Sequence, residues 1–94
     1  MNIEKLIHEG APVVDVRTPG EFSMGSVPNS KNIPLNEVPQ RIEEFKAMNQ
    51  PLVLCCASGN RSGQAAAFLS QQGVECYNGG GWMDVNYVLS QKSA

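Results

Sequence analysis

The sequence predicts a single α/β domain with a small, mostly parallel sheet of four or five strands and helices on both of its faces. Two observations carry this prediction. Short apolar runs that suit strands alternate with segments of helical periodicity, which is typical of parallel sheets. The 94 residues, 41% of them hydrophobic, supply enough apolar material for one core and too little for two. We therefore assign residues 1–94 to one domain.

The first half of the chain contains five predicted elements. They are a short helix that ends at Gly10, a buried strand over residues 13–16, a helical turn that starts at Thr18-Pro19, a brief strand centred on Ile33, and a helix over residues 38–48. The last helix is predicted because apolar residues recur at spacings of four and three, at Val38, Ile42, Phe45 and Met48.

The second half begins with a continuous apolar run, Leu52–Cys55, which suits a strand covered on both faces. The remaining predicted elements are a helix over residues 62–72, a short strand over 74–77, a flexible glycine turn over 78–81 and a last helix that starts at Trp82. Strands separated by helices pair in parallel, so the carboxyl ends of the strands should meet at one edge of the sheet.

Charge and cysteine content restrict the partners and the compartment. A formal net charge of -2 provides no broad basic surface, so neither nucleic acid nor a membrane is an expected partner. The first residues lack the features of a secretory signal, and no apolar run is long enough to span a bilayer. Three cysteines leave at least one thiol unpaired, which favours a reducing compartment. We expect a cytoplasmic protein, unless a leader has been removed, and we favour a monomer.

Cys56 is the candidate catalytic residue because it stands just beyond the buried strand, where open parallel sheets bind their ligands. The backbone N–H groups of the following loop, at the start of a helix, can form an anion-binding nest. Arg61 adds a permanent positive charge, and Gly59 allows unusual backbone angles. The predicted substrate-binding residues are Ala57, Ser58, Gly59, Asn60, Arg61 and Ser62.

Such a loop is able to activate the thiol of Cys56. Lowering a cysteine pKa by ~2 units from its usual ~8.5 requires about 2.7 kcal/mol. A helix terminus supplies ~0.3–1 kcal/mol and each hydrogen bond to a charged group ~1.5–3 kcal/mol, so two or three donors suffice. A histidine base is therefore unnecessary, and we expect His8, the one histidine, to be a surface residue of the first helix.

Four motifs occur in an order that is similar to that of the rhodanese (sulfurtransferase) family. They are Asp15-Val16-Arg17-Thr18-Pro19-Gly20-Glu21-Phe22, Asn32-Ile33-Pro34-Leu35, the loop Cys56-x-x-Gly59-x-Arg61-Ser62, and Asn78-Gly79-Gly80-Gly81-Trp82. Together they extend over most of the chain, and an ordered set is far more specific than any one of them. The chain thus resembles a single rhodanese-like domain over residues 1–94.

The resemblance implies a sulfurtransferase that needs no cofactor and no metal. The Cys56 thiolate would take the outer sulfur of a small sulfur-containing anion such as thiosulfate and hold it as a persulfide. It would then pass the sulfur to a thiol or another thiophilic acceptor, either a small molecule or a protein. The loop amides would stabilise the anionic persulfide, and Arg61 would bind the sulfonate end of the donor or hold the loop.

Several alternatives remain open from the residues alone. The protein is a persulfide carrier or regulatory module if it turns over little. Phosphatase relatives have five residues between cysteine and arginine, whereas this chain has only the four between Cys56 and Arg61.

Cys55 should point away from Cys56 into the core, with a resolving thiol as the alternative. Arg17 and Glu21 have the spacing of an ion pair across a turn.

Overall fold

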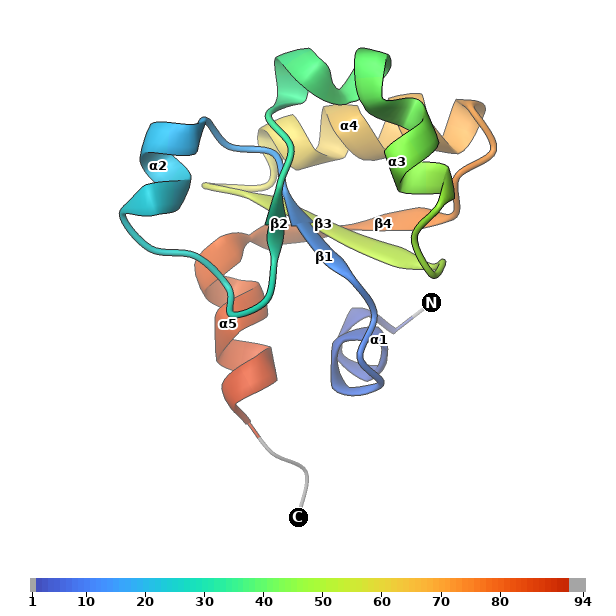
Figure 1. The fold of residues 1–94 in the computed structure, drawn as a ribbon. Coiled ribbons are helices and arrows are strands. Elements are labelled where there is room, and N and C mark those ends of the chain that lie inside the picture. Colours follow the sequence, from blue (N-terminus) through green and yellow to red (C-terminus); the bar gives the residue numbers. More distant parts are fainter. Residues whose placement is uncertain (1, 92–94) are drawn as a thin grey trace.

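The computed structural model describes residues 2–91, which form a four-stranded parallel sheet with helices on both faces (Figure 1). The strands lie in the order β2-β1-β3-β4, and every neighbouring pair is parallel. Their bounds are β1 Val13–Asp15, β2 Lys31–Asn32, β3 Leu52–Cys56 and β4 Cys76–Gly81. The predicted fold class is confirmed.

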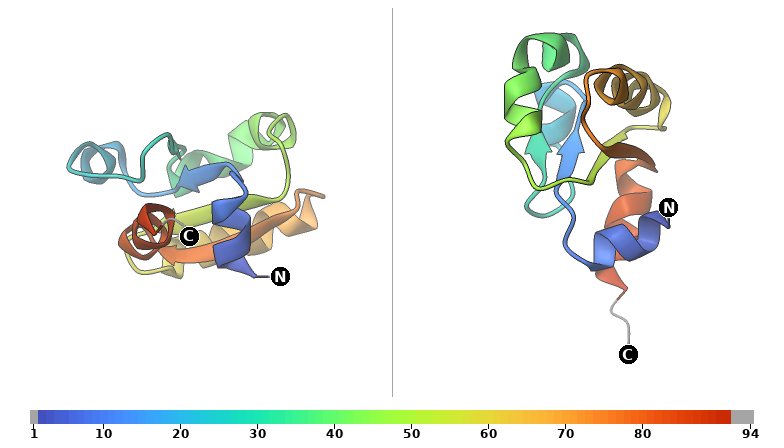
Figure 2. Two further views of the ribbon diagram at one scale, coloured as in Figure 1. Left: turned by 90° about the horizontal axis from the view of Figure 1, so that it is seen from below. Right: turned by 90° about the vertical axis from the view of Figure 1, so that its right-hand side faces the viewer.

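The helices form two layers, which the right-hand view of Figure 2 shows on opposite sides of the sheet. One face is covered by η1 (Leu35–Arg41), α3 (Ile42–Lys46) and α4 (Asn60–Gln71), and the other by α1 (Ile3–His8) and α5 (Trp82–Ser90). The remaining helix, α2 (Pro19–Ser23), follows the carboxyl end of β1. No helix within residues 2–91 combines the length and the apolar character needed to cross a bilayer.

Strand β3 is buried on both faces because it lies between β1 and β4 and under both helix layers. Leu54 and Cys56 join the core cluster beneath α3 and α4, whereas Val53 and Cys55 join the cluster beneath α1 and α5. Successive side chains of a strand point to opposite faces, so the two adjacent cysteines are separated by the sheet itself. The predicted core position of Cys55 is confirmed.

The prediction of one helix over residues 38–48 is wrong. The segment consists of the 3-10 helix η1 and the short α-helix α3, and Pro39 lies inside η1. Proline lacks the N–H that an α-helix needs, and its ring clashes with the preceding turn. Val38 and Phe45 are nevertheless buried, so the apolar spacing identified the inward-facing residues although the backbone differs.

The flexible turn predicted over residues 78–81 is also wrong, because these residues belong to strand β4, which continues to Gly81. Asn78 pairs with Leu54 and Gly81 with Cys56, with an irregularity between them. A Cβ added at Gly81 would lie 2.8 Å from the carbonyl oxygen of Ala57. Glycine therefore permits a close approach of two backbones here, which a rule that treats glycine as turn-forming does not anticipate.

Smaller differences concern element ends. Helix α4 starts at Asn60 instead of Ser62, β3 ends at Cys56 instead of Cys55, and Ile33 follows β2 instead of lying at its centre. The predicted turn at Thr18-Pro19 is helix α2, which begins with a capping box between Thr18 and Glu21. His8 is exposed on α1, as predicted, and its Nε2 lies 2.9 Å from the carbonyl oxygen of Val88.

Candidate active site

Cys56 is the last residue of β3, at the carboxyl edge of the sheet. The chain then forms a short loop, and Gly59 takes the position before α4 with a φ of 99°. A positive φ of this size strains any residue with a Cβ, and a Cβ here would also lie 3.1 Å from the Cα of Gly80. Glycine at position 59 thus allows the tight turn that folds the loop back over the sulfur.

The loop directs hydrogen-bond donors at the sulfur of Cys56. The backbone N–H of Gly59 donates to Sγ at 3.0 Å, the backbone N–H of Ser62 at 3.4 Å, and the hydroxyl oxygen of Ser62 lies 3.4 Å from the same atom. Both N–H groups belong to the loop and the first turn of α4, where the helix dipole adds a positive potential. The predicted inward-facing amides are therefore present.

These donors decide the protonation of the Cys56 thiol. Burial alone would raise its pKa, since only 1% of the residue is exposed. Hydrogen bonds from the Ser62 hydroxyl and from the N–H groups of Ser62, Ser58 and Gly59 outweigh burial and lower the pKa from 9.0 to about 7. Roughly half of the Cys56 side chains are then thiolates at neutral pH.

The guanidinium of Arg61 does not point at Sγ of Cys56, as the N–H groups of Gly59 and Ser62 do. Its Nη1 and Nη2 donate to the two carboxylate oxygens of Glu21 on α2, at 2.7 and 3.0 Å. Hydrogen bonds from Arg61 are the largest of the effects that lower the pKa of Glu21 to about 2. This ion pair connects the loop after β3 with the helix after β1, so Arg61 acts here as a brace between the two segments.

Arg17 and Glu21, whose spacing allows an ion pair, do not pair with each other. Arg17 pairs instead with the buried carboxylate of Asp15, with Nη2 2.7 Å from Oδ2, and it donates to the carbonyl oxygen of Gly25 at 2.7 Å. Its guanidinium also lies 4.8 Å from the ring centre of Trp82, a distance at which a cation interacts favourably with an aromatic face. The buried pair with Asp15 fixes Arg17 at the end of β1. Its contact with Trp82 then links this end of the strand to the start of α5.

The other predicted loop residues surround the sulfur without adding side-chain contacts to it. Ala57 and Ser58 are exposed. Asn60 is exposed too, and its Oδ1 accepts a hydrogen bond from Gln64 at 3.1 Å. These positions therefore contribute backbone and shape, while Ser62 alone contributes a side-chain group within reach of Sγ.

Asn78 is a site residue that sequence reasoning missed. Its Oδ1 accepts from the Ser62 hydroxyl at 2.7 Å and from the N–H of Gly80 at 2.9 Å, and its Nδ2 donates to the carbonyl oxygen of Gly59 at 2.9 Å. The available signal is the motif that starts at Asn78, which contributes to the family resemblance but whose glycines predict a turn. Only the pairing of β4 with β3 brings this side chain beside the loop.

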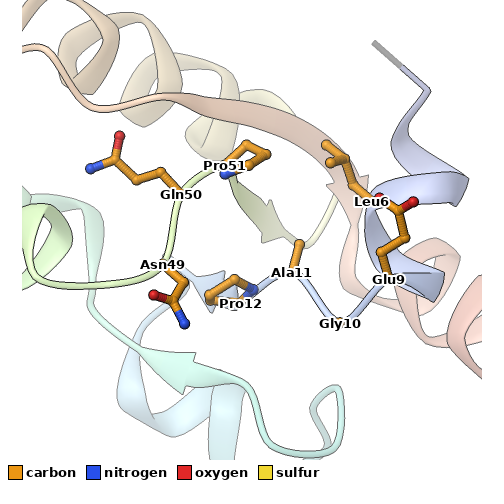
Figure 3. Close-up of a pocket in the computed structure, with 8 residues that line it drawn as sticks. All are labelled: Leu6, Glu9, Gly10, Ala11, Pro12, Asn49, Gln50 and Pro51. Carbon is orange, nitrogen blue, oxygen red and sulfur yellow. The ribbon is translucent and has the colours of Figure 1, made fainter.

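A separate hollow lies at the opposite, amino-terminal end of the sheet (Figure 3). It has a volume of about 260 Å³, and Leu6, Ala11 and Pro51 are among the residues that line it. Glu9 is the one ionisable side chain among its described lining residues, so the hollow offers no thiol and no cation. Within residues 2–91 no three potential metal ligands of the His, Cys, Asp or Glu type lie together.

Comparison with known proteins agrees with the fold. The rhodanese-like domain model matches residues 2–86. A sulfurtransferase of Allochromatium vinosum is 40% identical over 65 residues, which are 69% of this chain and 60% of that protein. Thiosulfate sulfurtransferase GlpE of Pseudomonas aeruginosa is 38% identical over 71 residues, which are 76% of this chain and 64% of GlpE. The chain thus spans less than two thirds of the length of these two relatives.

A solved structure described as a rhodanese with anions from E. coli has the same fold. It is 35% identical, superimposes with a TM-score of 0.72, and is matched over 80% of this chain and 91% of that one. The residues that the family model matches include β3 and the loop that follows it. The chain belongs to the rhodanese-like domain family.

Proposed function

We propose that this protein is a sulfurtransferase in which Cys56 carries a sulfane sulfur from a donor such as thiosulfate to a thiophilic acceptor. One observation carries the proposal: the N–H groups of Gly59 and Ser62 point at Sγ of Cys56. The names of the relatives from Allochromatium vinosum and Pseudomonas aeruginosa support the same class of reaction. The substrates are a small sulfur-containing anion and a thiol, which a protein is able to supply.

The reaction has two steps. The thiolate of Cys56 attacks the outer sulfur of thiosulfate, a new S–S bond forms, and sulfite leaves with the electron pair of the broken S–S bond. The acceptor then attacks the outer sulfur of the persulfide, and Cys56 leaves as a thiolate. No oxidant, metal or added base is required, since the nucleophile is already ionised near neutral pH.

The loop supports this chemistry better than phosphoryl transfer. The amides already converge on Sγ, so they stabilise a charged sulfur instead of enclosing a space for a tetrahedral anion. Arg61 is held by Glu21, so in this proposal it keeps the loop in place and does not bind the sulfonate end of the donor.

A carrier that holds a persulfide and turns over little uses the same residues. The three cysteines in the described part of the chain are all unpaired, which suits a reducing compartment, and we propose the cytoplasm as the location. The carrier role and the enzyme role need the same side chains around Cys56. Only a measurement of turnover separates the two roles.

The test combines mass spectrometry with an assay of sulfur transfer. The protein is incubated with thiosulfate and weighed, and then cyanide is added and thiocyanate is measured. We expect a gain of one sulfur atom on the peptide that contains Cys56, followed by repeated thiocyanate production. Cys56→Ser should abolish both signals, whereas Cys55→Ala, the matched control on the other face of β3, should retain them.

Each other outcome has a defined meaning. A single sulfur that is carried without turnover supports the carrier. Transfer that is unchanged in Cys56→Ser contradicts the proposal, because no second described cysteine has comparable donors at its sulfur.

A further inference from the structure

The hydroxyl group of Ser62 lies between two acceptors but has only one hydrogen to donate. Its oxygen is 2.7 Å from Oδ1 of Asn78 and 3.4 Å from Sγ of Cys56. Ser62 has no exposed surface, so its hydroxyl cannot exchange either contact for a hydrogen bond to water. The same hydrogen cannot serve both acceptors fully, so the two contacts compete.

The amide of Asn78 can be oriented from its neighbours. Its Oδ1 receives the N–H of Gly80, and its Nδ2 donates to the carbonyl oxygen of Gly59. The reverse orientation would place an NH₂ group against an N–H and an oxygen against a carbonyl oxygen. At 2.7 Å, two oxygens need a hydrogen between them, and Oδ1 carries none. The Ser62 hydroxyl therefore donates to Asn78 in this arrangement.

This orientation leaves a lone pair of the Ser62 oxygen toward Cys56. A neutral thiol is able to donate its S–H to that lone pair, which gives a chain of hydrogen bonds from Cys56 through Ser62 to Asn78. A thiolate has no hydrogen to donate, and it is stabilised further if the Ser62 hydroxyl donates to it beside the backbone N–H groups. The hydroxyl then has to rotate away from Asn78, which loses its shortest hydrogen bond.

We propose that Asn78 is a positioning residue that competes with Cys56 for the single hydroxyl hydrogen of Ser62 and thereby limits formation of the reactive thiolate. In this step the S–H bond breaks and its proton leaves to solvent. No bond of Ser62 or Asn78 breaks, since the O–H only turns from one acceptor to the other. The relevance of this control for sulfur transfer rests on the proposed function, in which the thiolate is the nucleophile.

The same competition distinguishes the loaded from the unloaded protein. In a persulfide the charge lies on the outer sulfur, and Sγ becomes a neutral divalent sulfur that accepts hydrogen bonds weakly. The Ser62 hydroxyl then returns to Asn78. Asn78 thus favours the two states in which Sγ is uncharged, the thiol and the persulfide, over the free thiolate.

A double-mutant cycle on the whole chain tests the proposal without any sulfurtransferase assay. The rate at which iodoacetamide alkylates Cys56 is measured against pH, by mass spectrometry of the peptide, for the wild type, Asn78→Asp, Asn78→Ala, Ser62→Ala and both double variants. Asp retains the acceptor oxygen and strengthens it with a charge, whereas Ala removes it. Ser62→Thr, which keeps the hydroxyl, serves as the conservative control.

The Ser62→Ala background separates the hydroxyl from every other effect. Each substitution at position 78 also disturbs the brace on Gly59, and Asn78→Asp adds a charge, but these effects act in both backgrounds. The charged groups near the loop are likewise unchanged between the backgrounds: Arg61 with Glu21, Arg17 with Asp15, and Asp84 at the start of α5. The cycle therefore measures the coupling through Ser62 alone.

We expect couplings of opposite sign. With Ser62 present, Asn78→Asp should slow alkylation at pH 7 about three- to tenfold more than it does in the Ser62→Ala background, the size expected for one hydrogen bond. Asn78→Ala should slow alkylation less with Ser62 present than in the Ser62→Ala background, because the hydroxyl is then free to serve the sulfur. Ser62→Thr, which keeps the hydroxyl, should retain the sign of both couplings.

Effects of Asn78→Asp and Asn78→Ala that are the same in both backgrounds would overturn the proposal and leave Asn78 as a brace of the loop. Because Asn78 is exposed, these variants should fold, and their thermal unfolding checks this. If Asn78→Ala is unfolded, Asn78→Asp with its cycle still decides the question. If the thiocyanate assay fails but both expected couplings are measured, the proposed enzyme function is rejected and this inference is retained.

Discussion

Cys55 and Cys56 are neighbours in β3 and equally buried, with exposed fractions of 0% and 1%, yet their thiols differ from an ordinary cysteine in opposite directions. The pKa of Cys55 is raised to about 12, and the pKa of Cys56 is lowered to about 7. A lack of surface exposure thus does not separate them. The difference comes from how densely each sulfur is packed and from the groups that each face of the strand presents to it.

The face of Cys55 offers apolar contacts and an unfavourable charge. Burial among residues of α1 and α5 is the largest cause of its raised pKa, and the carboxylate of Asp15 raises it further, while Arg17 partly offsets this. Burial raises the pKa of Cys56 too, but hydrogen bonds from Ser62 and from the loop amides outweigh it. A buried thiol is therefore inert or reactive according to its hydrogen-bond donors.

The pH dependence of alkylation is the test with the largest expected difference between Cys55 and Cys56. A group with a lowered pKa is charged above that value, so the reaction of Cys56 should fall about tenfold per unit as the pH drops below about 7 and should level off above it. Cys55, with a pKa of about 12, should react at least ~100-fold more slowly at pH 7. Mass spectrometry of the alkylated peptides distinguishes the two sites.

The control is Cys56→Ser, in which no rapid alkylation of the native protein should remain. Comparable alkylation of Cys55 and Cys56 in the folded wild type would contradict the comparison. Unfolding in denaturant should then make all cysteines reactive at similar rates, because the difference between them belongs to the folded state.

Two glycines of β4 test the two thiols separately, because one packs against the loop beside Cys56 and the other against the core on the Cys55 face. A Cβ at Gly81 would be 2.8 Å from the carbonyl oxygen of Ala57 in the loop, whereas a Cβ at Gly79 would be 2.7 Å from Cγ1 of Val53 and 2.9 Å from Cγ2 of Val85. Gly81→Ala should displace the loop and slow alkylation of Cys56 at pH 7 about fivefold, as expected if the pKa rises from about 7 by about one unit.

Gly79→Ala should instead overpack the core on the Cys55 face, and the protein should lose ~1–3 kcal/mol of stability in denaturant unfolding. Its pH profile for Cys56 should remain that of the wild type. A large change in this profile for Gly79→Ala, with none for Gly81→Ala, would reverse the assignment of the two glycines to the two faces.

The smallest expected effect concerns the ion pair between Glu21 and Arg61. Because the pKa of Glu21 is about 2, the pair is formed at any pH above about 3. Glu21→Gln leaves the charge of Arg61 uncompensated near the sulfur, so alkylation of Cys56 should extend to lower pH by less than about one unit. The KM for thiosulfate should fall a few-fold, since a cation is released for the donor.

Glu44→Gln, which disrupts the ion pair of Glu44 with Arg41 on the helices η1 and α3, is the matched control and should change neither quantity. A thiosulfate KM that rises in Glu21→Gln would indicate that the brace of the loop matters more than the free charge.

Much of the candidate site was predictable because its chemistry is local. The alternation of a β-strand places Cys55 and Cys56 on opposite faces, and a glycine three residues later with a helix after it suffices to aim N–H groups at a sulfur. The same local rules fail at residues 78–81, where the glycines predict a turn although they serve close packing against β3.

The partners of charged and polar side chains were not predictable in this way. Arg17 and Glu21 have the spacing of an ion pair, but each takes a different partner, because Asp15 lies two residues from Arg17 on the same strand end and α4 delivers Arg61 to Glu21. Asn78 likewise meets Ser62 only through the neighbouring position of β3 and β4. Such contacts depend on which segments adjoin in space.

By itself the sequence determined the α/β class, the buried central strand, the opposite orientations of Cys55 and Cys56, and the loop around the candidate nucleophile. These follow from periodicity and from residue types whose effects act over a few positions. The tertiary structure decided the pairing of Arg61 with Glu21, the strand character of the glycine segment, and the sharing of the Ser62 hydroxyl between Cys56 and Asn78. Hydrogen bonds and ion pairs act over only a few ångströms, so residues distant in the chain interact only after the sheet has placed them side by side.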